Sequence, residues 1–242
     1  PLAWITNAGS GNVSVIDTAT DQISGPPVTT ASSPRAVAVS ETHVYVAHDS
    51  GTLSIINKST HMVTTVPLPA GLPGGVAVSP DGTRVYIAST DNDAFYVLDA
   101  TTQALITTLS IDHPTGVAVK PDGSRIYVGS DDGFNARVAV INAATNSLLA
   151  PIGLSGREPT GLAVSPDGTR LYVCVNTSAT VAAINLDTGT VLANISVGVD
   201  PRGIIVNHAG TRVYVAEYLS HQVGVIDTAF AIVRRARKRS GV

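Results

Sequence analysis

Short runs in which apolar residues alternate with polar or small ones recur along the whole chain, separated by turn residues. Val13-Ser14-Val15-Ile16 and Val181-Ala182-Ala183-Ile184 are two such runs. Alternation over about four to eight residues is typical of β-strands with one buried face. No apolar stretch approaches the ~18 residues that a membrane-spanning helix needs. The pattern therefore predicts an all-β protein built from many short strands.

Three markers in the sequence recur with one period. An aromatic residue stands at six positions separated by 41, 41, 41, 45 and 42 residues, an Asx residue closes six strand-like runs, and a proline opens five further segments. A repeat of this length is one supersecondary unit that stacks on its neighbours. The markers are Trp4, Tyr45, Tyr86, Tyr127, Tyr172 and Tyr214; Asp17, Asn57, Asp99, Asn142, Asn185 and Asp227; and Pro34, Pro73, Pro114, Pro159 and Pro201.

Each period contains four short strands, which we name A to D in chain order. In the fifth repeat they are residues 161–164, 170–173, 181–184 and 191–195. A Pro-Asp-Gly turn joins A to B, because proline presets φ and glycine accepts the positive φ that ends a hairpin. It occurs at residues 80–82, 121–123 and 166–168, whereas residues 40–43 and 208–210 depart from it.

Small residues at alternate positions of strand A, such as Gly161 and Ala163, predict that this strand is the innermost one, where radial sheets crowd together. Six radial four-stranded antiparallel sheets make a β-propeller. The rival repeat fold, a parallel β-helix, has shorter coils and lacks two hairpin turns per period. We expect one propeller domain over residues 1–233 and a basic C-terminal tail over residues 234–242.

The first blade unit has no inner strand in this chain. The chain opens in strand B (residues 2–6) and ends in a strand D (residues 231–235), so strand A of blade one is missing. Two explanations stay open: the chain is a fragment of a longer one, or another segment or chain supplies the strand. Six blades is then the minimum, and seven would need further residues.

Charge and composition exclude some functions. Residues are 44% hydrophobic and 14% charged, and Val, Thr, Ala and Gly are common, as in strands joined by tight turns. Five of the 15 basic residues lie in residues 234–242, which leaves ten against 18 acidic ones in the body. An acidic body argues against nucleic-acid binding by the propeller. The tail is either a contact for an anionic partner or membrane surface, or a solvated terminus.

The loops on one face of the propeller vary between repeats. The D–A connections and B–C loops share this face, and variable loops on a regular scaffold are the default place for function. If six blades close a ring, mixed charges gather at the channel mouth, where they would bind a polar ligand or, with His48 and Glu217, supply an acid–base pair. The alternative is ordinary exposed loop residues. The predicted ligand-binding residues are Asn7, Arg35, His48, Asp200, Arg202 and Glu217.

Motifs for metals and cofactors are nearly absent. Asp91, Asp93, Asp131 and Asp132 on adjacent B–C loops are weak candidates for calcium, which takes six to eight oxygen ligands, but no EF-hand spacing is present and such residues are common in turns. The single cysteine, Cys174, lies in an apolar run and is predicted to be a buried hydrophobe. We expect no metal and no cofactor in this chain.

Two segments carry a family resemblance: residues 161–173, which read GLAVSPDGTRLYV, and residues 223–228, which read VGVIDT. They resemble the repeat of the YVTN β-propeller family, and the match spans residues 1 to about 233. The resemblance implies a surface-layer, periplasmic or exported propeller, and hence an extracytoplasmic location. It implies no common reaction.

We therefore expect an extracytoplasmic scaffold that binds a protein or glycan of the cell envelope or surface. One alternative is an enzyme at the channel mouth, since propellers similar to this one include lactonases and streptogramin-type lyases. Another is a propeller subunit of a periplasmic redox complex, with any cofactor held by a partner. The lack of a matching catalytic motif favours binding over catalysis.

Overall fold

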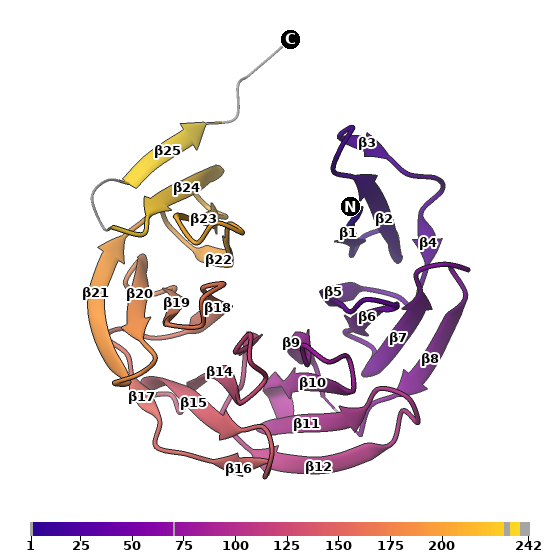
Figure 1. Ribbon diagram of the computed structural model, residues 1–242, viewed down its shortest axis with the longest axis horizontal. Coiled ribbons are helices and arrows are strands. Elements are labelled where there is room, and N and C mark those ends of the chain that lie inside the picture. The colour runs from indigo at the N-terminus through magenta and orange to yellow at the C-terminus, as the bar shows by residue number, and fades with distance from the viewer. Residues whose placement is uncertain (1, 70, 230–232, 238–242) are drawn as a thin grey trace. The chain divides into compact units, whose positions relative to one another are not determined.

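The computed structural model describes residues 2–69, 71–229 and 233–237, with the side chains of residues 233–237 left out of the description. Its regular structure consists of β-strands and one short 3-10 helix, η1 (Thr90–Asn92). The chain divides into two compact units, Pro1–Pro114 and Thr115–Val242. Each unit contains three antiparallel sheets (Figure 1).

The first unit contains blades 1 to 3. Blade 1 is formed by β1 (Leu2–Asn7), β2 (Asn12–Asp17), β3 (Gln22–Ile23) and β4 (Val28–Thr29). Blade 2 is formed by β5 (Pro34–Val39), β6 (His43–His48), β7 (Thr52–Asn57) and β8 (Val63–Pro67). Blade 3 is formed by β9 (Pro73–Val78), β10 (Arg84–Ser89), β11 (Ala94–Asp99) and β12 (Leu105–Ser110).

The second unit contains blades 4 to 6. Blade 4 is formed by β13 (Val117–Val119), β14 (Arg125–Asp131), β15 (Ala136–Asn142), β16 (Ser147–Leu148) and β17 (Ile152–Gly153). Blade 5 is formed by β18 (Pro159–Val164), β19 (Arg170–Val175), β20 (Thr180–Asn185) and β21 (Thr190–Ser196). Blade 6 is formed by β22 (Pro201–Val206), β23 (Arg212–Glu217), β24 (Gln222–Asp227) and β25 (Val233–Arg237).

These sheets confirm the predicted all-β propeller with six blade units. In blades 2 to 6 the strands follow the chain in the order A to D, each paired with the next. Blade 1 contains only B, C and a two-piece D, because β1 pairs with β2, and β2 pairs with both β3 and β4. The missing inner strand of the first blade is therefore confirmed for the described residues. The outer strand of blade 4 is also in two pieces, β16 and β17.

The A–B turns have the chemistry predicted from the Pro-Asp-Gly motif. Gly82, Gly123 and Gly168 have φ of 70°, 72° and 71°, the left-handed region that favours glycine. In the first of these turns the Gly82 N–H donates to the Ser79 carbonyl at 2.8 Å. Blade 2 lacks the glycine and closes with a tighter hairpin, in which the Ser40 N–H donates to the His43 carbonyl at 2.8 Å.

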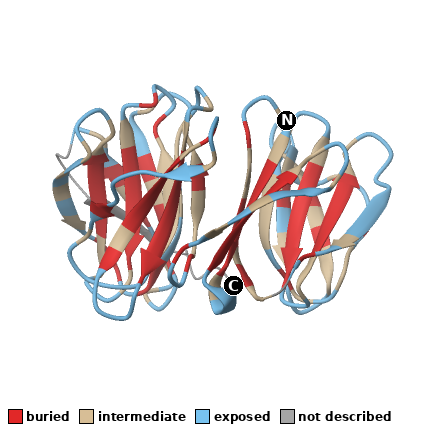
Figure 2. Ribbon diagram, turned by 90° about the horizontal axis from the view of Figure 1, so that it is seen from below, coloured by how far each residue is buried: buried red, intermediate tan, exposed pale blue. Residues whose placement is uncertain are grey.

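The core lies between the faces of successive blades within each unit. In the first unit Trp4, Val13 and Val15 of blade 1 pack on Val44 and Val46 of blade 2. Equivalent clusters join blades 2 and 3, blades 4 and 5, and blades 5 and 6. Most middle segments of strands B and C are buried, whereas the outer strands D and the loops are largely exposed (Figure 2). Function that needs contact with a partner must therefore use the loops or the outer strands.

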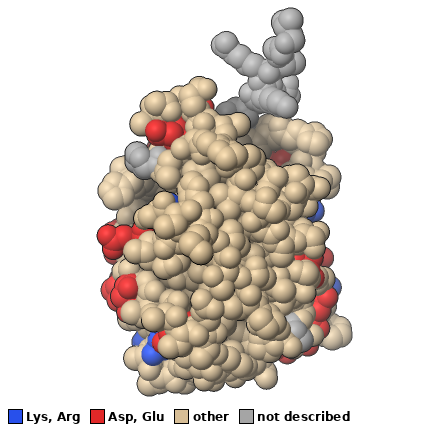
Figure 3. Space-filling view, turned by 90° about the vertical axis from the view of Figure 1, so that its right-hand side faces the viewer, with Lys and Arg blue, Asp and Glu red and all other residues tan. Residues whose placement is uncertain are grey.

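Cys174 is fully buried in the cluster between blades 5 and 6, as predicted. Burial raises the pKa of its thiol to about 12, so the thiol stays protonated and unreactive at neutral pH. Among the described residues no helix is long and apolar enough to cross a membrane. The side of the molecule drawn in Figure 3 is mostly uncharged, with scattered acidic and basic groups and no basic patch.

Candidate functional site

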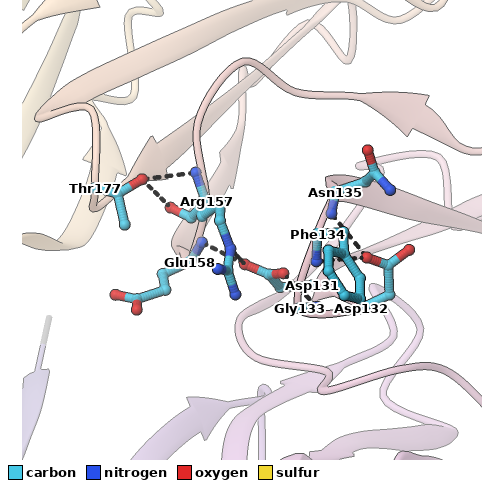
Figure 4. A network of polar contacts seen from close by, with 8 residues as sticks. All are labelled: Asp131, Asp132, Gly133, Phe134, Asn135, Arg157, Glu158 and Thr177. Atoms are coloured by element: carbon cyan, nitrogen blue, oxygen red, sulfur yellow. Dashed lines mark hydrogen bonds and ion pairs between the residues drawn. The ribbon is translucent and has the colours of Figure 1, made fainter.

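In the second unit, polar contacts tie the variable-face loops of one blade to those of the next. At the end of β14, Asp131 accepts the backbone N–H of Glu158 at 2.8 Å and the Nε of Arg157 at 3.4 Å (Figure 4). The Arg157 N–H donates to the Thr177 hydroxyl at 2.7 Å. These contacts fasten the D–A connection of blade 5 on both sides. The loops of neighbouring blades are therefore linked directly to one another within the second unit.

The same arrangement continues into blade 6 through Asp200. The amide of Asn176 donates to Asp200 Oδ1 at 2.6 Å. Arg202 holds the carboxylate with both its Nε, at 3.0 Å from each oxygen, and its Nη2, at 2.9 Å from Oδ2. The Asp200 side chain is only 7% exposed, so the carboxylate end of these charge-assisted bonds is shielded from water, whereas the Arg202 side chain is 59% exposed. They lower the pKa of Asp200, with the Arg202 hydrogen bond as the largest cause, and keep the pair ionised.

Two loops of blade 6 meet above this pair. The Tyr218 N–H donates to the Asp200 carbonyl at 3.0 Å, and the Val199 N–H donates to the Ser220 hydroxyl at 2.8 Å. The Arg202 guanidinium carbon lies 4.3 Å from the centroid of the Tyr218 ring, within cation–π range. The buried carboxylate of Asp200 thus positions an arginine, and the arginine supports an aromatic ring.

Large apolar side chains are exposed at this place. Val199 is 56% exposed, Tyr218 57% and Leu219 59%. We call Val199, Arg202, Tyr218 and Leu219 the blade 6 patch. Burying such side chains against a partner is favourable, and the hydrogen bonds beneath them reduce the entropy that binding would cost. The patch is therefore an exposed, largely apolar surface on a hydrogen-bonded support.

Backbone strain at Asp200 belongs to the repeat rather than to the patch. Its φ is 56°, an uncommon value for a residue other than glycine. Ser33, His113 and Glu158, which stand before the same proline in other blades, have φ of 52°, 39° and 56°. Four of the five D–A prolines are therefore preceded by a left-handed residue, and before Pro73 the left-handed residue is Gly71, two positions earlier. The patch is distinguished by its side chains.

Comparisons with known proteins agree with the fold. Residues 61–208, more than half of the chain, match the family model described as outer membrane protein assembly factor BamB. The chain belongs to this family. A comparison with curated proteins gives no match. The family match confirms the prediction that the chain belongs to a propeller repeat family.

Two solved structures resemble the BamB-family chain over almost its whole length. A functionally unknown protein from Desulfotomaculum acetoxidans has 18% sequence identity and a TM-score of 0.79, covering 98% of this chain and 78% of its own. Hydrazine synthase from Kuenenia stuttgartiensis has 19% identity and a TM-score of 0.68, and the match covers 95% of this chain and 93% of the hydrazine synthase chain. At such identities the likeness shows the propeller fold alone.

Of the six predicted ligand-binding residues, the structure brings Asp200 and Arg202 into contact. Glu217 directly precedes Tyr218, but its side chain turns inward and is 1% exposed. The carboxylate oxygens of Glu217 occupy the space that a side chain at position 198 or 224 would need, and both of these residues are glycine. No described residue hydrogen-bonds to the carboxylate. Glu217 is therefore buried between β24 and the loop residue Gly198, beneath the variable-face loops and not exposed on them.

The other three predicted residues, Asn7, Arg35 and His48, belong to the first unit. Arg35 pairs with Asp49 at 3.3 Å in an exposed position, and the Asn7 amide donates to Ser14 and Asn12 at 2.8 Å. His48 is fully buried, with Nε2 2.9 Å from the Ser54 hydroxyl. Burial is the main cause that lowers its pKa, so the imidazole is kept neutral.

Three of the four acidic calcium candidates have local partners. Asp93 accepts the His113 N–H at 2.7 Å, Asp131 is held by blade 5 as described, and Asp132 caps its own loop and pairs with Arg137 at 3.2 Å. Asp91 lies in the first turn of η1. Within residues 2–69, 71–229 and 233–237 no group of three or more His, Cys, Asp or Glu side chains is arranged to hold a metal ion.

Sequence reasoning missed the apolar members of the patch, although a signal was present. The loop after strand B reads Thr90-Asp91-Asn92 in blade 3 and Asn176-Thr177-Ser178 in blade 5, but Tyr218-Leu219-Ser220 in blade 6. Two large apolar residues replace polar ones at a position that the repeat exposes. An aligned comparison of loops between blades would have identified them.

Proposed function

We propose that this chain is an extracytoplasmic propeller scaffold that binds a protein of the cell envelope through the blade 6 patch. The family description, an assembly factor for outer membrane proteins, supports an envelope location and a protein partner. The observation that carries the proposal is the exposed Tyr218 supported by Arg202. Tyrosine and arginine are enriched among the residues that dominate binding energy in protein interfaces.

A protein partner fits the patch better than a glycan does. Three of its four members present apolar surface, and the charge of Arg202 is already satisfied by Asp200. The burial of both His48 and Glu217 favours this binding role over a lactonase or lyase, which would need them to reach a substrate. We also propose that the repeat is of the YVTN type, on the strength of the run over residues 161–173.

Removing the two large side chains of the patch should weaken partner binding strongly. For the double variant Tyr218→Ala and Leu219→Ala we expect about thirtyfold weaker binding, because truncating a central interface residue costs about 2 kcal/mol or more. The measurement is retention of detergent-solubilised envelope proteins on the immobilised chain, followed by titration of the retained protein.

The matched control is Phe134→Ala. Phe134 is 87% exposed on the B–C loop of blade 4 and is not part of the patch, so its removal should leave binding unchanged. Equal binding by the double variant and the parent chain would contradict the proposal. So would an equal loss in the Phe134→Ala control.

A further inference from the structure

A cavity of about 470 Å³ opens between blades 4 and 5, both of which belong to the second unit. Its walls come from both blades, among them Tyr127 and Val140 of blade 4 and Leu186 of blade 5. Residues beside the A–B turn of blade 4 and in the C–D turn of blade 5 also line it, so the cavity lies on the turn face, away from the blade 6 patch. A volume of several hundred Å³ with an apolar lining and a few polar groups is typical of small-molecule sites.

The interrupted outer strand of blade 4 leaves room for this cavity. Between β16 and β17 the chain reads Leu149-Ala150-Pro151, and the ladder to β15 is broken there. In blade 5, by contrast, β21 pairs with β20 from Thr180 to Asn185. Leu149, Ala150 and Ile152 line the cavity. The break therefore exposes apolar side chains that a continuous outer strand would cover.

Two lining residues depart from the repeat. Lys120 of blade 4 stands before the A–B turn, where blades 2, 3, 5 and 6 have serine or asparagine. Leu186 of blade 5 follows the Asx residue of strand C, where the other five blades have threonine, lysine or alanine. The turns form without these two residues in the other blades, so the turns do not require them. The equivalents are Ser40, Ser79, Ser165 and Asn207 for Lys120, and Thr18, Lys58, Ala100, Ala143 and Thr228 for Leu186.

The arginine at the start of strand B is used differently in blades 4 and 5. In blade 5 the Arg170 Nη1 donates to the Thr228 carbonyl at 2.5 Å, which ties the arginine to the C–D turn of blade 6. In blade 4 Arg125 lines the cavity, and its Nη1 donates to the carbonyl of the adjacent Ser124 at 3.2 Å. No acidic side chain of the described residues forms an ion pair with Arg125, whereas Lys120 lies 2.9 Å from an Asp122 oxygen. Arg125 is therefore the cationic group of the cavity that is free to bind an anion.

We propose that this cavity binds a small organic acid that has one carboxylate and an apolar body. The carboxylate pairs with Arg125, because a guanidinium presents parallel N–H groups to the two oxygens of a carboxylate. The apolar body lies against Val140, Ile152 and Leu186. Asp187, which also lines the cavity and is exposed, repels a second negative charge, so the site selects monocarboxylates over dicarboxylates. The proposal does not rest on the blade 6 patch.

The probe is sodium hydrocinnamate, a phenyl ring on a short chain that ends in one carboxylate. Titration into the isotope-labelled chain, followed by amide chemical shifts, should give saturable shifts at millimolar probe, confined to blades 4 and 5 around the cavity. The primary amide of hydrocinnamate should bind about tenfold more weakly, because it cannot form the charge-assisted pair. Phenylsuccinate, which carries a second carboxylate, should also bind more weakly than hydrocinnamate.

Three variants separate the roles of charge and apolar contact. Arg125→Gln should bind hydrocinnamate about tenfold more weakly and its amide as the parent chain does, a difference that a general loss of structure would not produce. Leu186→Thr, which restores the residue type of blades 1 and 6, should weaken the acid and the amide alike. Arg212→Gln is the matched control, because Arg212 holds the same repeat position in blade 6 and does not line the cavity.

Four results would overturn the proposal. They are the absence of saturable shifts at millimolar hydrocinnamate, shifts centred outside blades 4 and 5, equal affinity of the parent chain for the acid and the amide, and an equal loss of binding in the Arg125→Gln and Arg212→Gln variants.

Discussion

Replacing Gly161 with alanine should destabilise the protein by about 2 to 3 kcal/mol, as overpacking of a filled core does. Gly161 lies in β18, where an added Cβ would collide with the backbone carbonyl oxygen of Arg202 in β22 and lie 3.1 Å from the Ile204 Cγ2. The carbonyl belongs to the paired inner strand of the next blade and cannot rotate away. The inner strands of blades 5 and 6 would have to separate, which opens the interface between the two blades. Urea unfolding measures the effect: the transition midpoint should fall while the slope of the unfolding free energy against urea concentration stays unchanged.

Gly203 provides the matched control, because it occupies the same place in strand A of blade 6, two residues after the proline. An added Cβ there would meet only the Ala216 Cβ at 3.6 Å, an ordinary van der Waals contact. We expect Gly203→Ala to change stability by no more than about 0.5 kcal/mol. If both variants lost the same stability, the cost would lie in the strand backbone itself, and the account of packing between blades would be wrong.

Replacing Asp200 with alanine should cost about 2 kcal/mol and loosen the loops of blade 6, since hydrogen bonds to a shielded charged group contribute about that much. The substitution leaves Arg202 and the Asn176 amide without their acceptor. Without its support the Tyr218 ring loses a fixed position. Chymotrypsin should then cleave after Tyr218 several times faster than in the parent chain, and urea unfolding should show the loss of stability.

The dependence of this effect on pH gives a second readout. The pKa of Asp200 is lower in the folded protein than in the unfolded chain, where it is about 4. The contribution of Asp200 to the free energy of unfolding is therefore fully present above the unfolded pKa and is lost as the pH falls through the folded pKa. The parent and Asp200→Ala stabilities should therefore converge below about pH 4. Asp49→Ala is the control, because its pair with Arg35 is exposed and should contribute no more than about 0.5 kcal/mol. Equal losses in the two variants at neutral pH would show that shielding of Asp200 has no role.

The fold was predictable because its signals are local and repeated. The turn glycines, the strand B aromatics and the Asx residues after strand C each fix a short piece of chain, and their repetition along the chain removes the ambiguity of any one of them. Prolines also explain the two interrupted outer strands. Pro26-Pro27 falls between β3 and β4, and Pro151 falls between β16 and β17, where a strand would need N–H groups that proline lacks.

The site was predictable only in part, because burial depends on residues across the sheet. Asp200 and Arg202 are two residues apart in the sequence, so their pairing does not depend on how strands B and C are aligned. His48 and Glu217 hold the same place at the end of strand B, and both turn inward for reasons set by strand C. His48 bonds to Ser54, while Glu217 occupies the space beside Gly224. The sequence shows these pairs only when the register of strands B and C is known.

The measurement that tests the central claim most directly is site-specific photocrosslinking in the cell envelope. A photoreactive amino acid at position 219 replaces Leu219 in the blade 6 patch, and the same amino acid at position 134 replaces the exposed Phe134 of blade 4. The account predicts one discrete crosslinked protein from position 219 and none from position 134. The same adduct from both positions, or an adduct from position 134 alone, would show that the partner docks elsewhere and would contradict the assignment of the patch.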